Sequence, residues 1–324
     1  MSEGSVLVTG GNSGIGFECA RALARAGRHV VIASRSRRAS QEAVQKIAAE
    51  SGTDRIEAMD LDLASPSSIR RFASDIDARN LPLQSLVCNA GLQFTKGPVL
   101  SEDGYELTFA VNHLGHFLLT NLLLSRLASR APSRIVIVSS GVHDPGRFTG
   151  MPKPKIADLE TLAATGGATP GGFSGPLAYV NSKVCNLWFA YELARRLDAA
   201  GLSRSDRPIA VNSFDPGLVP GSGLAREYHP AARFVWESVM PAMASLLTRF
   251  VPGISTAPKS GSALAALVLE PRLGAAGARY YPSHTRWYET PSSNQSYDIE
   301  RARELWEASV RMSGLAAGES PLAA

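Results

Sequence analysis

The sequence predicts an α/β protein of the Rossmann type: a doubly wound parallel sheet with helices on both faces. Short apolar runs alternate with helical patterns from the first residues onward, and most connections between them are short. Such alternation implies right-handed crossovers between parallel strands. In addition, a glycine-rich turn joins the first apolar run to the first helical pattern, where this fold holds the pyrophosphate of a dinucleotide.

Each element follows from its own pattern. The strands are expected as buried apolar runs at Val6–Thr9, His29–Ala33, Ile56–Asp60, Ser85–Cys88, Arg134–Ser139 and Ile209–Asp215. The helices repeat apolar residues at helical spacing, at Ile15–Ala26, Ala39–Glu50, Ser67–Ala78, Gly104–Ser129, Leu177–Ala200 and Asp298–Ser313. The last helix is amphipathic, and we expect it to pack on the core.

A chain of 324 residues is compatible with a single α/β domain over 1–324. Two stretches interrupt the alternation. One is a Pro- and Gly-rich insertion at 141–177, and the other is an irregular segment at 218–258 with an apolar, helical patch at Phe234–Phe250. Both follow strand ends where open α/β sheets bind ligands, so both are candidates for substrate loops or a lid. The alternative is that the insertion has no role.

Composition excludes several classes of protein. The net charge is only +4, and the basic residues are scattered without a dense tract that is interleaved with aromatics, so no nucleic-acid partner is expected. The longest apolar run, Val235–Val251, is broken by Glu237, Pro241 and Arg249, so no transmembrane segment is expected. The first residues lead directly into a strand without a secretion signal, and we expect a cytoplasmic protein.

Cysteine and histidine spacings do not predict a metal site. Cys19, Cys88 and Cys185 fall in expected core elements, so they are expected to be buried and reduced. His113 and His116 lie three residues apart on one helix, but the sequence offers no third ligand nearby, and we expect no metal.

The glycine-rich turn is the first candidate binding site. Glycines allow a tight turn and a close approach of the backbone to a pyrophosphate, while the following helix offers free N–H groups. The residues expected to bind the cofactor here are Gly10, Asn12, Ser13, Gly14, Ile15 and Gly16.

The end of the second strand favours NADP(H) over NAD(H). An acidic residue there would bind the ribose hydroxyl of NAD, but this chain has the run Ser34-Arg35-Ser36-Arg37-Arg38. A guanidinium beside a hydroxyl suits a phosphate, and we assign this role to Ser34 and Arg35. The alternative is an exposed basic loop without a ligand. We expect Asp62 and Leu63 at the adenine, and Asn89-Ala90-Gly91 at the adenosine ribose.

A second group of residues predicts acid/base chemistry. Tyr179 and Lys183 are four residues apart at the start of a helix, so they share one face, and a neighbouring ammonium favours the phenolate form of a tyrosine. Ser140, after the fifth strand, can hold a substrate oxygen, and Asn112 can anchor a water that relays protons to Lys183. A Tyr–Lys pair at this spacing usually lies on the exposed surface of a helix and has no catalytic role. The order of the other motifs along the chain favours an active site here.

These motifs together resemble the short-chain dehydrogenase/reductase family over nearly the whole chain. The shared features are the glycine turn, Asn89-Ala90-Gly91, Asn112, Ser140, the Tyr179/Lys183 pair and Pro216-Gly217. The resemblance implies a catalytic Asn-Ser-Tyr-Lys tetrad, a Lys183 that also holds the nicotinamide ribose, and Pro216 and Gly217 beside the nicotinamide. The usual Thr after Pro-Gly is Gly221 here, which leaves Ser222 as the nearest hydroxyl for the carboxamide.

Two branches of that family are more similar than the rest. The motif Asn112-His113-Leu114-Gly115-His116-Phe117 and the region Ala302–Leu315 resemble retinol dehydrogenase-like enzymes and light-dependent protochlorophyllide reductases. The run Ser182-Lys183-Val184-Cys185-Asn186 resembles the reductases. This chain departs from them at Leu218, where they carry Cys, and at Gly91, where they carry Ala.

The main hypothesis is an NADP(H)-dependent oxidoreductase that transfers a hydride between nicotinamide and a carbonyl or alcohol carbon of a bulky apolar substrate, with Tyr179 as general acid/base. The alternatives are a protochlorophyllide reductase-like photoenzyme and a non-catalytic NADP-binding sensor. Members of the family often pair through the two long helices that correspond to Gly104–Ser129 and Leu177–Ala200, so the resemblance is compatible with a homo-oligomer. The apolar patch is expected to form the substrate wall or a lid; its residues are Phe234, Val235, Trp236, Met240, Met243 and Leu246.

Overall fold

A central parallel sheet carries two hydrophobic cores, one on each face. Side chains of successive strand residues point to opposite faces. In β1 (Ser5–Thr9), Leu7 therefore belongs to one core, and Val6 and Val8 belong to the other; all three are fully buried. The computed structural model describes residues 4–167, 172–221, 234–247, 253–283 and 288–322.

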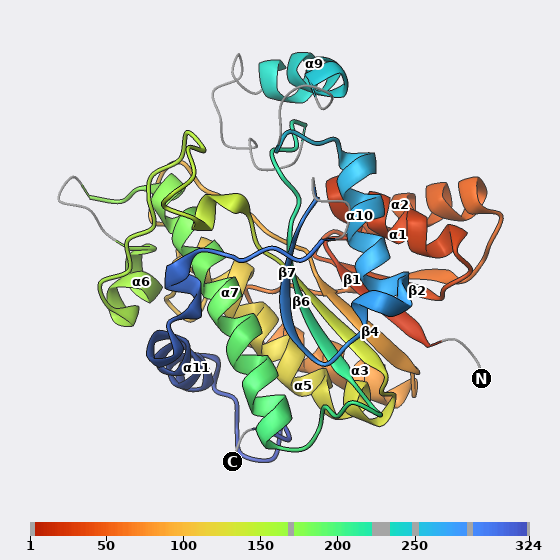
Figure 1. Cartoon of the computed structure of the whole chain (residues 1–324). Helices are drawn as coiled ribbons and strands as arrows, with labels where there is room; N and C mark the ends of the chain where they lie inside the picture. Colours follow the sequence, from red (N-terminus) through yellow and green to blue (C-terminus); the bar gives the residue numbers. More distant parts are fainter. Residues whose placement is uncertain (1–3, 168–171, 222–233, 248–252, 284–287, 323–324) are drawn as a thin grey trace.

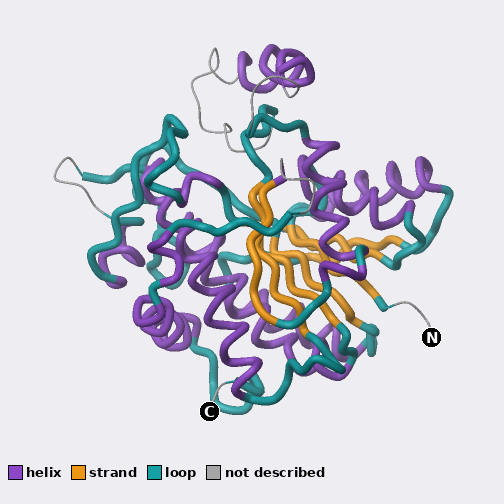
Figure 2. Tube along the Cα trace, in the orientation of Figure 1, coloured by secondary structure: helices purple, strands orange, loops and turns teal. Residues whose placement is uncertain are grey.

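The sheet has seven strands in the order β3-β2-β1-β4-β5-β6-β7, and all neighbours pair in parallel (Figures 1 and 2). After β1 the strands are β2 (Val30–Ser34), β3 (Ile56–Asp60), β4 (Leu83–Cys88), β5 (Ser133–Val138), β6 (Ile209–Asp215) and β7 (Gly277–Pro282). The order reverses between β1 and β4, and ligands of open α/β sheets bind at this switch point, beyond the carboxyl ends of the strands.

Helices cover both faces, which confirms the predicted Rossmann-type architecture. The core on one face contains side chains of α1 (Gly14–Arg25), α2 (Arg37–Ser51) and α10 (Ala257–Leu269). The core on the other face contains side chains of α3 (Pro66–Ala78), α5 (Gly115–Ser129) and α7 (Gly175–Ala199). As predicted, the amphipathic helix α11 (Ile299–Ser313) packs on α7, with Leu305 and Trp306 buried (Figure 1).

Two elements of the sheet domain were not predicted from the sequence. The apolar face of α10 consists largely of small residues, so its helical pattern is faint, but these residues let it approach α1 closely. A Cβ on Gly261 would lie 2.3 Å from the Cβ of Glu18. The other element is β7, which lies at the edge of the sheet. An edge strand is less buried than a central one, so its apolar pattern is short and is interrupted by Arg279.

The predicted helix Gly104–Ser129 differs from the structure in a way that matters for the site. The helix begins at Leu107, as α4 (Leu107–Phe109), and continues as a π-helical segment, Ala110–Leu114, before α5. Such π-helical turns are frequent at functional sites. This one contains Asn112, and the helical periodicity of the sequence does not reveal it.

The two interrupting stretches lie near the carboxyl ends of the strands. The insertion at 141–177 forms a short turn, Gly141–His143, and α6 (Leu159–Thr165), which packs on α7. The apolar patch of the second stretch forms a π-helical turn, Val235–Val239, and α9 (Met240–Leu247). Figure 1 shows α9 (cyan) beyond the carboxyl ends of the strands. The irregular segment predicted at 218–258 ends slightly too late, because α10 already begins at Ala257.

One helical stretch among the described residues, Leu107–Ser129, is long and apolar enough to span a membrane by composition, and 89% of its most apolar window is buried inside the fold. This burial is typical of a core helix. The three cysteines are also buried, with free thiols, as expected. Burial raises the pKa of each thiol, in Cys88 to about 12, so none is a reactive thiolate at neutral pH.

Candidate active site

A cleft of about 760 Å³ opens beyond the carboxyl ends of the strands, at the switch point between β1 and β4. It brings together almost every site residue that was predicted from the sequence. The predicted residues that line it are Gly10, Asn12, Ser13, Gly14, Ile15, Gly16, Ser34, Arg35, Asp62, Leu63, Asn89, Ala90, Gly91, Ser140, Tyr179, Lys183, Pro216 and Gly217. Asn112 lies behind the lining, and Ser222 lies outside the described residues.

The glycine turn has a backbone that other residues would not tolerate. Gly10 and Gly14 have φ values of +65° and +56°. A Cβ on Gly16 would lie 2.4 Å from the carbonyl oxygen of Gly10, so α1 starts tightly against the turn. The N-cap residue Ser13 makes no side-chain capping hydrogen bond, which leaves the first N–H groups of α1 to a ligand. This cradle fits the pyrophosphate of a dinucleotide.

The Asn89 side chain supports the glycine turn, and the predicted contact of Asn89-Ala90-Gly91 with the adenosine ribose stays a prediction. Its Nδ2 donates to the carbonyl oxygens of Thr9 (2.9 Å) and Gly10 (3.5 Å). In return, the Thr9 Oγ1 accepts the backbone N–H groups of Asn89 (2.9 Å) and Ala90 (3.0 Å). These bonds tie the end of β4 to the end of β1 and so fix the floor of the cleft. Ala90 and Gly91 remain small lining residues, as predicted.

The basic run after β2 separates into arginines with different partners. Arg37 and Arg38 already belong to the first turn of α2, and they pair with Asp60 (3.5 Å) and Glu42 (2.8 Å). Arg35 lines the cleft, is exposed, and forms no ion pair with any residue that the structure describes. Arg35 is therefore the guanidinium that is available to a phosphate at the adenosine end.

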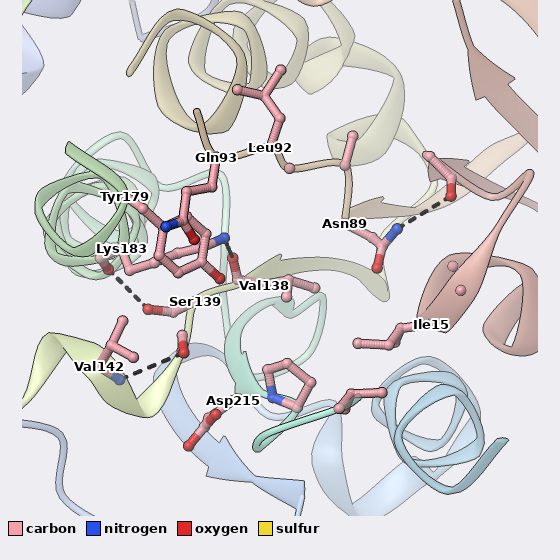
Figure 3. A pocket seen from close by; sticks show the side chains of 18 of the residues that line it. Ile15, Asn89, Leu92, Gln93, Val138, Ser139, Val142, Tyr179, Lys183 and Asp215 are labelled. Atoms are coloured by element: carbon pink, nitrogen blue, oxygen red, sulfur yellow. Dashed lines mark hydrogen bonds between the residues drawn. The ribbon is translucent and has the colours of Figure 1, made fainter. Parts of the chain in front are cut away.

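Tyr179 and Lys183 both lie in the first turns of α7 and both line the cleft (Figure 3). The helix starts at Gly175 because the Ser174 hydroxyl accepts the N–H of Leu177. The Lys183 Nζ lies 5.4 Å from the centre of the Tyr179 ring and donates to the carbonyl oxygen of Val138 (3.0 Å). Burial lowers the pKa of Lys183 to about 8, and the nearby carboxylate of Asp215 partly opposes this effect.

The two serines that follow β5 point in different directions. The buried Ser139 Oγ donates to the carbonyl oxygen of Lys183 (2.8 Å) and so attaches α7 to the strand. Ser140 lines the cleft, and within the part of the chain that the structure describes its Oγ makes only a long contact, 3.5 Å, with the N–H of Val142. Ser140, as predicted from the sequence, is therefore the serine whose hydroxyl is available to a ligand.

His143 holds Ser140 from behind, a function that was not predicted from the sequence. Its Nε2 accepts the N–H of Ser293 (3.1 Å), so its Nδ1 carries the proton that it donates to the carbonyl oxygen of Ser140 (2.7 Å). Burial lowers the pKa of His143, which favours this neutral form. The only sequence signal was a histidine three residues after the serine.

Asn112 acts as a clamp on the neighbouring loop. Its side chain accepts the N–H of Leu92 (2.8 Å) and donates to the carbonyl oxygen of Leu92 (3.0 Å) and to the Ser182 hydroxyl (3.0 Å). A Cβ on Gly91 would lie 3.4 Å from the Asn112 Oδ1 and 3.7 Å from the Lys183 Nζ, so both groups lie close to the same point of the loop. The side-chain amide is thus committed to protein partners. The predicted water relay stays a prediction.

His116 and His113 bond to different parts of the fold. The His116 Nδ1–H donates to the carbonyl oxygen of Asn112 (3.2 Å), and its Nε2 therefore accepts the Thr9 hydroxyl (2.9 Å). The His113 Nε2 pairs with the Ser309 hydroxyl (2.9 Å). Burial is the main cause that lowers the pKa values of His116 to about 4 and His113 to about 3, so both are neutral. Among the described residues, no group of three potential ligands surrounds a metal position.

Asp215, at the end of β6, also lines the cleft and was not predicted as a site residue. The Asp215 Oδ1 accepts the N–H of Gly217 (2.9 Å), and its Oδ2 accepts the Tyr280 hydroxyl (3.2 Å) and lies 3.4 Å from the Arg147 Nη1. These bonds fix the Pro216-Gly217 turn at the cleft. Asp215 looks like an ordinary strand end in the sequence, and only the packing of β7 beside β6 supplies its Tyr280 partner.

Most of the described residues predicted to form a substrate wall or a lid do not line the cleft, so the wall is not confirmed and the lid stays a prediction. Of Phe234, Val235, Trp236, Met240 and Met243, only Trp236 lines the cleft; the side chain of Leu246 is not described. Phe234 and Met243 are exposed, at 63% and 54%. The apolar residues that line the cleft come instead from the loops after β4 and β5 and from the segment between β6 and α10: Leu92, Val142, Phe148, Met151, Leu218, Val219 and Ile254.

Comparison with known proteins gives the same family as the motifs. The model of the short chain dehydrogenase family matches residues 5–151. Protochlorophyllide reductase A of Triticum aestivum is 35% identical over 332 residues, which covers 98% of this chain and 82% of that protein. The chain belongs to the short-chain dehydrogenase family. It is therefore an oxidoreductase of that family. The human WW domain-containing oxidoreductase is 36% identical over 307 residues, and the match covers 95% of this chain and 67% of that protein.

Solved structures share the fold of this short-chain dehydrogenase family member. The Pseudomonas aeruginosa RhlG–NADP complex has a TM-score of 0.62 at 22% identity, covering 86% of this chain and 94% of that one. A blue fluorescent protein from a metagenomic library, in complex with NADPH, has a TM-score of 0.58 at 23% identity and covers 86% of this chain and 95% of that one.

Proposed function

We propose that this protein is an NADPH-dependent reductase of a carbonyl compound with a bulky apolar body, or an alcohol dehydrogenase that runs the same reaction in reverse. One observation carries the proposal. Tyr179 and Lys183 line the same cleft as the glycine turn, with the Lys183 ammonium 5.4 Å from the Tyr179 ring. The apolar lining from Leu92, Val142 and Val219 favours a substrate with a large apolar body.

The side chains divide the chemistry among them. NADPH supplies the hydride when it is bound in the cleft. The Tyr179 hydroxyl gives its proton to the substrate oxygen, and the adjacent Lys183 ammonium stabilises the phenolate that remains. The Ser140 hydroxyl donates a hydrogen bond to the same oxygen as its negative charge develops. His143, which bonds the Ser140 carbonyl, keeps that hydroxyl in place.

A panel of bulky ketones, aldehydes and polyene alcohols tests the proposal, with nicotinamide absorbance followed for each cofactor. We expect NADPH-dependent reduction of at least one bulky ketone or aldehyde, or NADP-dependent oxidation of one of the alcohols. A protein that binds NADPH but turns over no member of the panel in either direction would instead favour the non-catalytic sensor.

Arg35 is expected to determine the preference for NADPH. It lines the cleft and has no acidic partner among the described residues, so it offers its donors to a 2′-phosphate; the solved structures of the same fold contain NADP or NADPH. Arg35→Ala removes charge-assisted hydrogen bonds and is expected to raise the KM for NADPH by about 10- to 100-fold, without a comparable change for NADH. Steady-state kinetics with both cofactors measure this ratio.

Arg38 provides the matched control, because it has the same charge three residues later but pairs with Glu42 outside the cleft. Arg38→Ala is expected to leave the ratio of NADPH to NADH unchanged. If both variants shift the ratio equally, the effect comes from the general field of the basic run, and Arg35 has no specific role.

Light-dependent reduction of protochlorophyllide is a second candidate, because plant relatives that carry that name are about 35% identical over 98% of this chain. The expected result is nevertheless negative, since Leu218 lines the cleft where those reductases carry a cysteine. The test mixes the protein with NADPH and protochlorophyllide, in the dark and under illumination, and follows chlorophyllide absorbance. Product that forms only in the light would replace the first proposal.

A further inference from the structure

Gln93 has a buried side-chain nitrogen without a hydrogen-bond partner among the described residues. It lies in the loop after β4 and is only 7% exposed, and it lines the cleft together with Tyr179 and Lys183. Its Nε2 is buried and makes no hydrogen bond to any residue that the structure describes. Figure 3 shows the Gln93 side chain extending toward Tyr179 and Lys183. Buried amides are nearly always hydrogen-bonded, so an unpartnered one at a ligand cleft requires an explanation.

The loop holds Gln93 rigidly from both sides. On one side, Asn112 bonds both the N–H and the carbonyl oxygen of Leu92. On the other side, the carbonyl of Phe94 lies directly against the start of α7, where a Cβ on Gly175 would come within 1.6 Å of the Phe94 oxygen. The backbone of Gln93 is therefore fixed between the two helices that carry Asn112 and Tyr179. A fixed backbone limits the positions that the Gln93 side chain can take and so favours preorganised binding of a ligand.

The neighbouring lining residues leave that donor to the substrate. Tyr179 and Ser140 serve the reacting oxygen in the proposed reaction, and the Lys183 Nζ already donates to Val138. Leu92, Val142 and Met151, which also line the cleft, have apolar side chains. A second oxygen on the substrate would satisfy the amide.

We propose that Gln93 is a specificity-determining residue whose side-chain N–H donates to a second oxygen of the substrate, on the carbon next to the reacting carbonyl. The substrate class is then an α-diketone or an α-hydroxy ketone with a bulky apolar body. This inference rests on the proposed reductase function and narrows its substrate. A hydride and a proton add across one C=O bond, as NADPH is oxidised to NADP, and the second oxygen is not changed.

Deoxybenzoin, benzoin and benzil form a matched series to test the proposal. All three are bulky aryl ketones: deoxybenzoin has no second oxygen, benzoin adds a hydroxyl on the next carbon, and benzil adds a carbonyl there. The measured quantity is the kcat/KM for benzil or benzoin divided by that for deoxybenzoin. Because each variant is compared with the wild type, the higher intrinsic reactivity of the diketone cancels.

Gln93→Met keeps the length of the side chain and removes the donor. We expect it to lower the ratio for benzil and for benzoin by about 10- to 100-fold. Gln93→Glu keeps the shape and also lacks the N–H group, so it is expected to lower the ratio as well. Unfolding midpoints and NADPH dissociation constants of both variants show whether the fold and the cofactor site are preserved.

The possible failures are distinguishable. If the wild type reduces these ketones and neither variant changes the ratio, Gln93 does not select the substrate, and the proposed function stands without this inference. The same conclusion follows if Gln93→Glu retains the wild-type ratio, because filling of space would then be the only role of the side chain. If the wild type reduces no bulky carbonyl compound, the proposed function itself fails, and the inference fails with it.

Discussion

Tyr179→Phe is expected to reduce kcat by about 10²- to 10⁴-fold, the usual contribution of a positioned acid/base. The variant keeps the ring that packs beside Lys183 and removes only the hydroxyl, so the cleft retains its shape. NADPH binding, measured by quenching of the intrinsic fluorescence, is expected to change by less than about threefold, because the loss of one neutral hydrogen bond has a modest effect. The loss therefore appears in the chemical step.

Tyr191 is the matched control for this prediction. It lies on the same helix, and its hydroxyl bonds the Ser292 hydroxyl (2.6 Å), away from the residues that line the cleft. Tyr191→Phe is expected to lower thermal stability slightly and to retain turnover. Wild-type turnover in Tyr179→Phe would contradict the assignment of Tyr179 as the acid/base.

Lys183→Met is expected to abolish most activity and to stabilise the protein at the same time. The ammonium is buried in the fold, and its lowered pKa shows that burial disfavours the charged form. A decrease from 10.5 to about 8 corresponds to roughly 3 kcal/mol of destabilisation at neutral pH. Methionine fills a similar volume without a charge. The carbonyl of Val138 stays paired, because the Asn186 Nδ2 also donates to it (3.1 Å).

The stability gain should depend on pH in a specific direction. Between about pH 8 and pH 10.5 the unfolded chain binds the Lys183 proton and the folded protein does not, so the stability of the wild type rises with pH across this window. Below pH 8 the destabilisation is complete. We therefore expect Lys183→Met to raise the free energy of unfolding by about 1–3 kcal/mol at pH 7, and by progressively less as the pH rises toward 10.

Urea unfolding of the apoprotein at several pH values measures this effect, and steady-state turnover measures the catalytic loss. A variant that is less stable than the wild type at pH 7 would show that Lys183 contributes net stability, through its bond to Val138 or its attraction to Asp215. A gain that is constant with pH would show that the improvement comes from packing and not from removal of a buried charge.

Much of the site was predictable because parallel strands end at one edge of the sheet. The glycine turn, Ser140, and the Tyr179/Lys183 pair each follow a strand or begin a helix at that edge, so the order of elements was sufficient to place them in one cleft. The residues that were missed act through partners distant in sequence. His143 depends on Ser293, and Asp215 depends on Tyr280; neither pairing leaves a local pattern.

The amino-acid sequence by itself determined six of the seven strands, the glycine turn and the Tyr179/Lys183 pair, because strand and helix periodicity and glycine backbone freedom are local properties. Only the tertiary structure decided which polar groups find partners. It committed the side-chain amides of Asn89 and Asn112 to protein partners and left the Arg35 guanidinium and the Gln93 amide at the cleft. It also placed most of the residues expected for a substrate wall or lid outside the cleft lining. Hydrogen-bond satisfaction and burial depend on contacts across the whole chain, and the sequence pattern of one segment does not contain them.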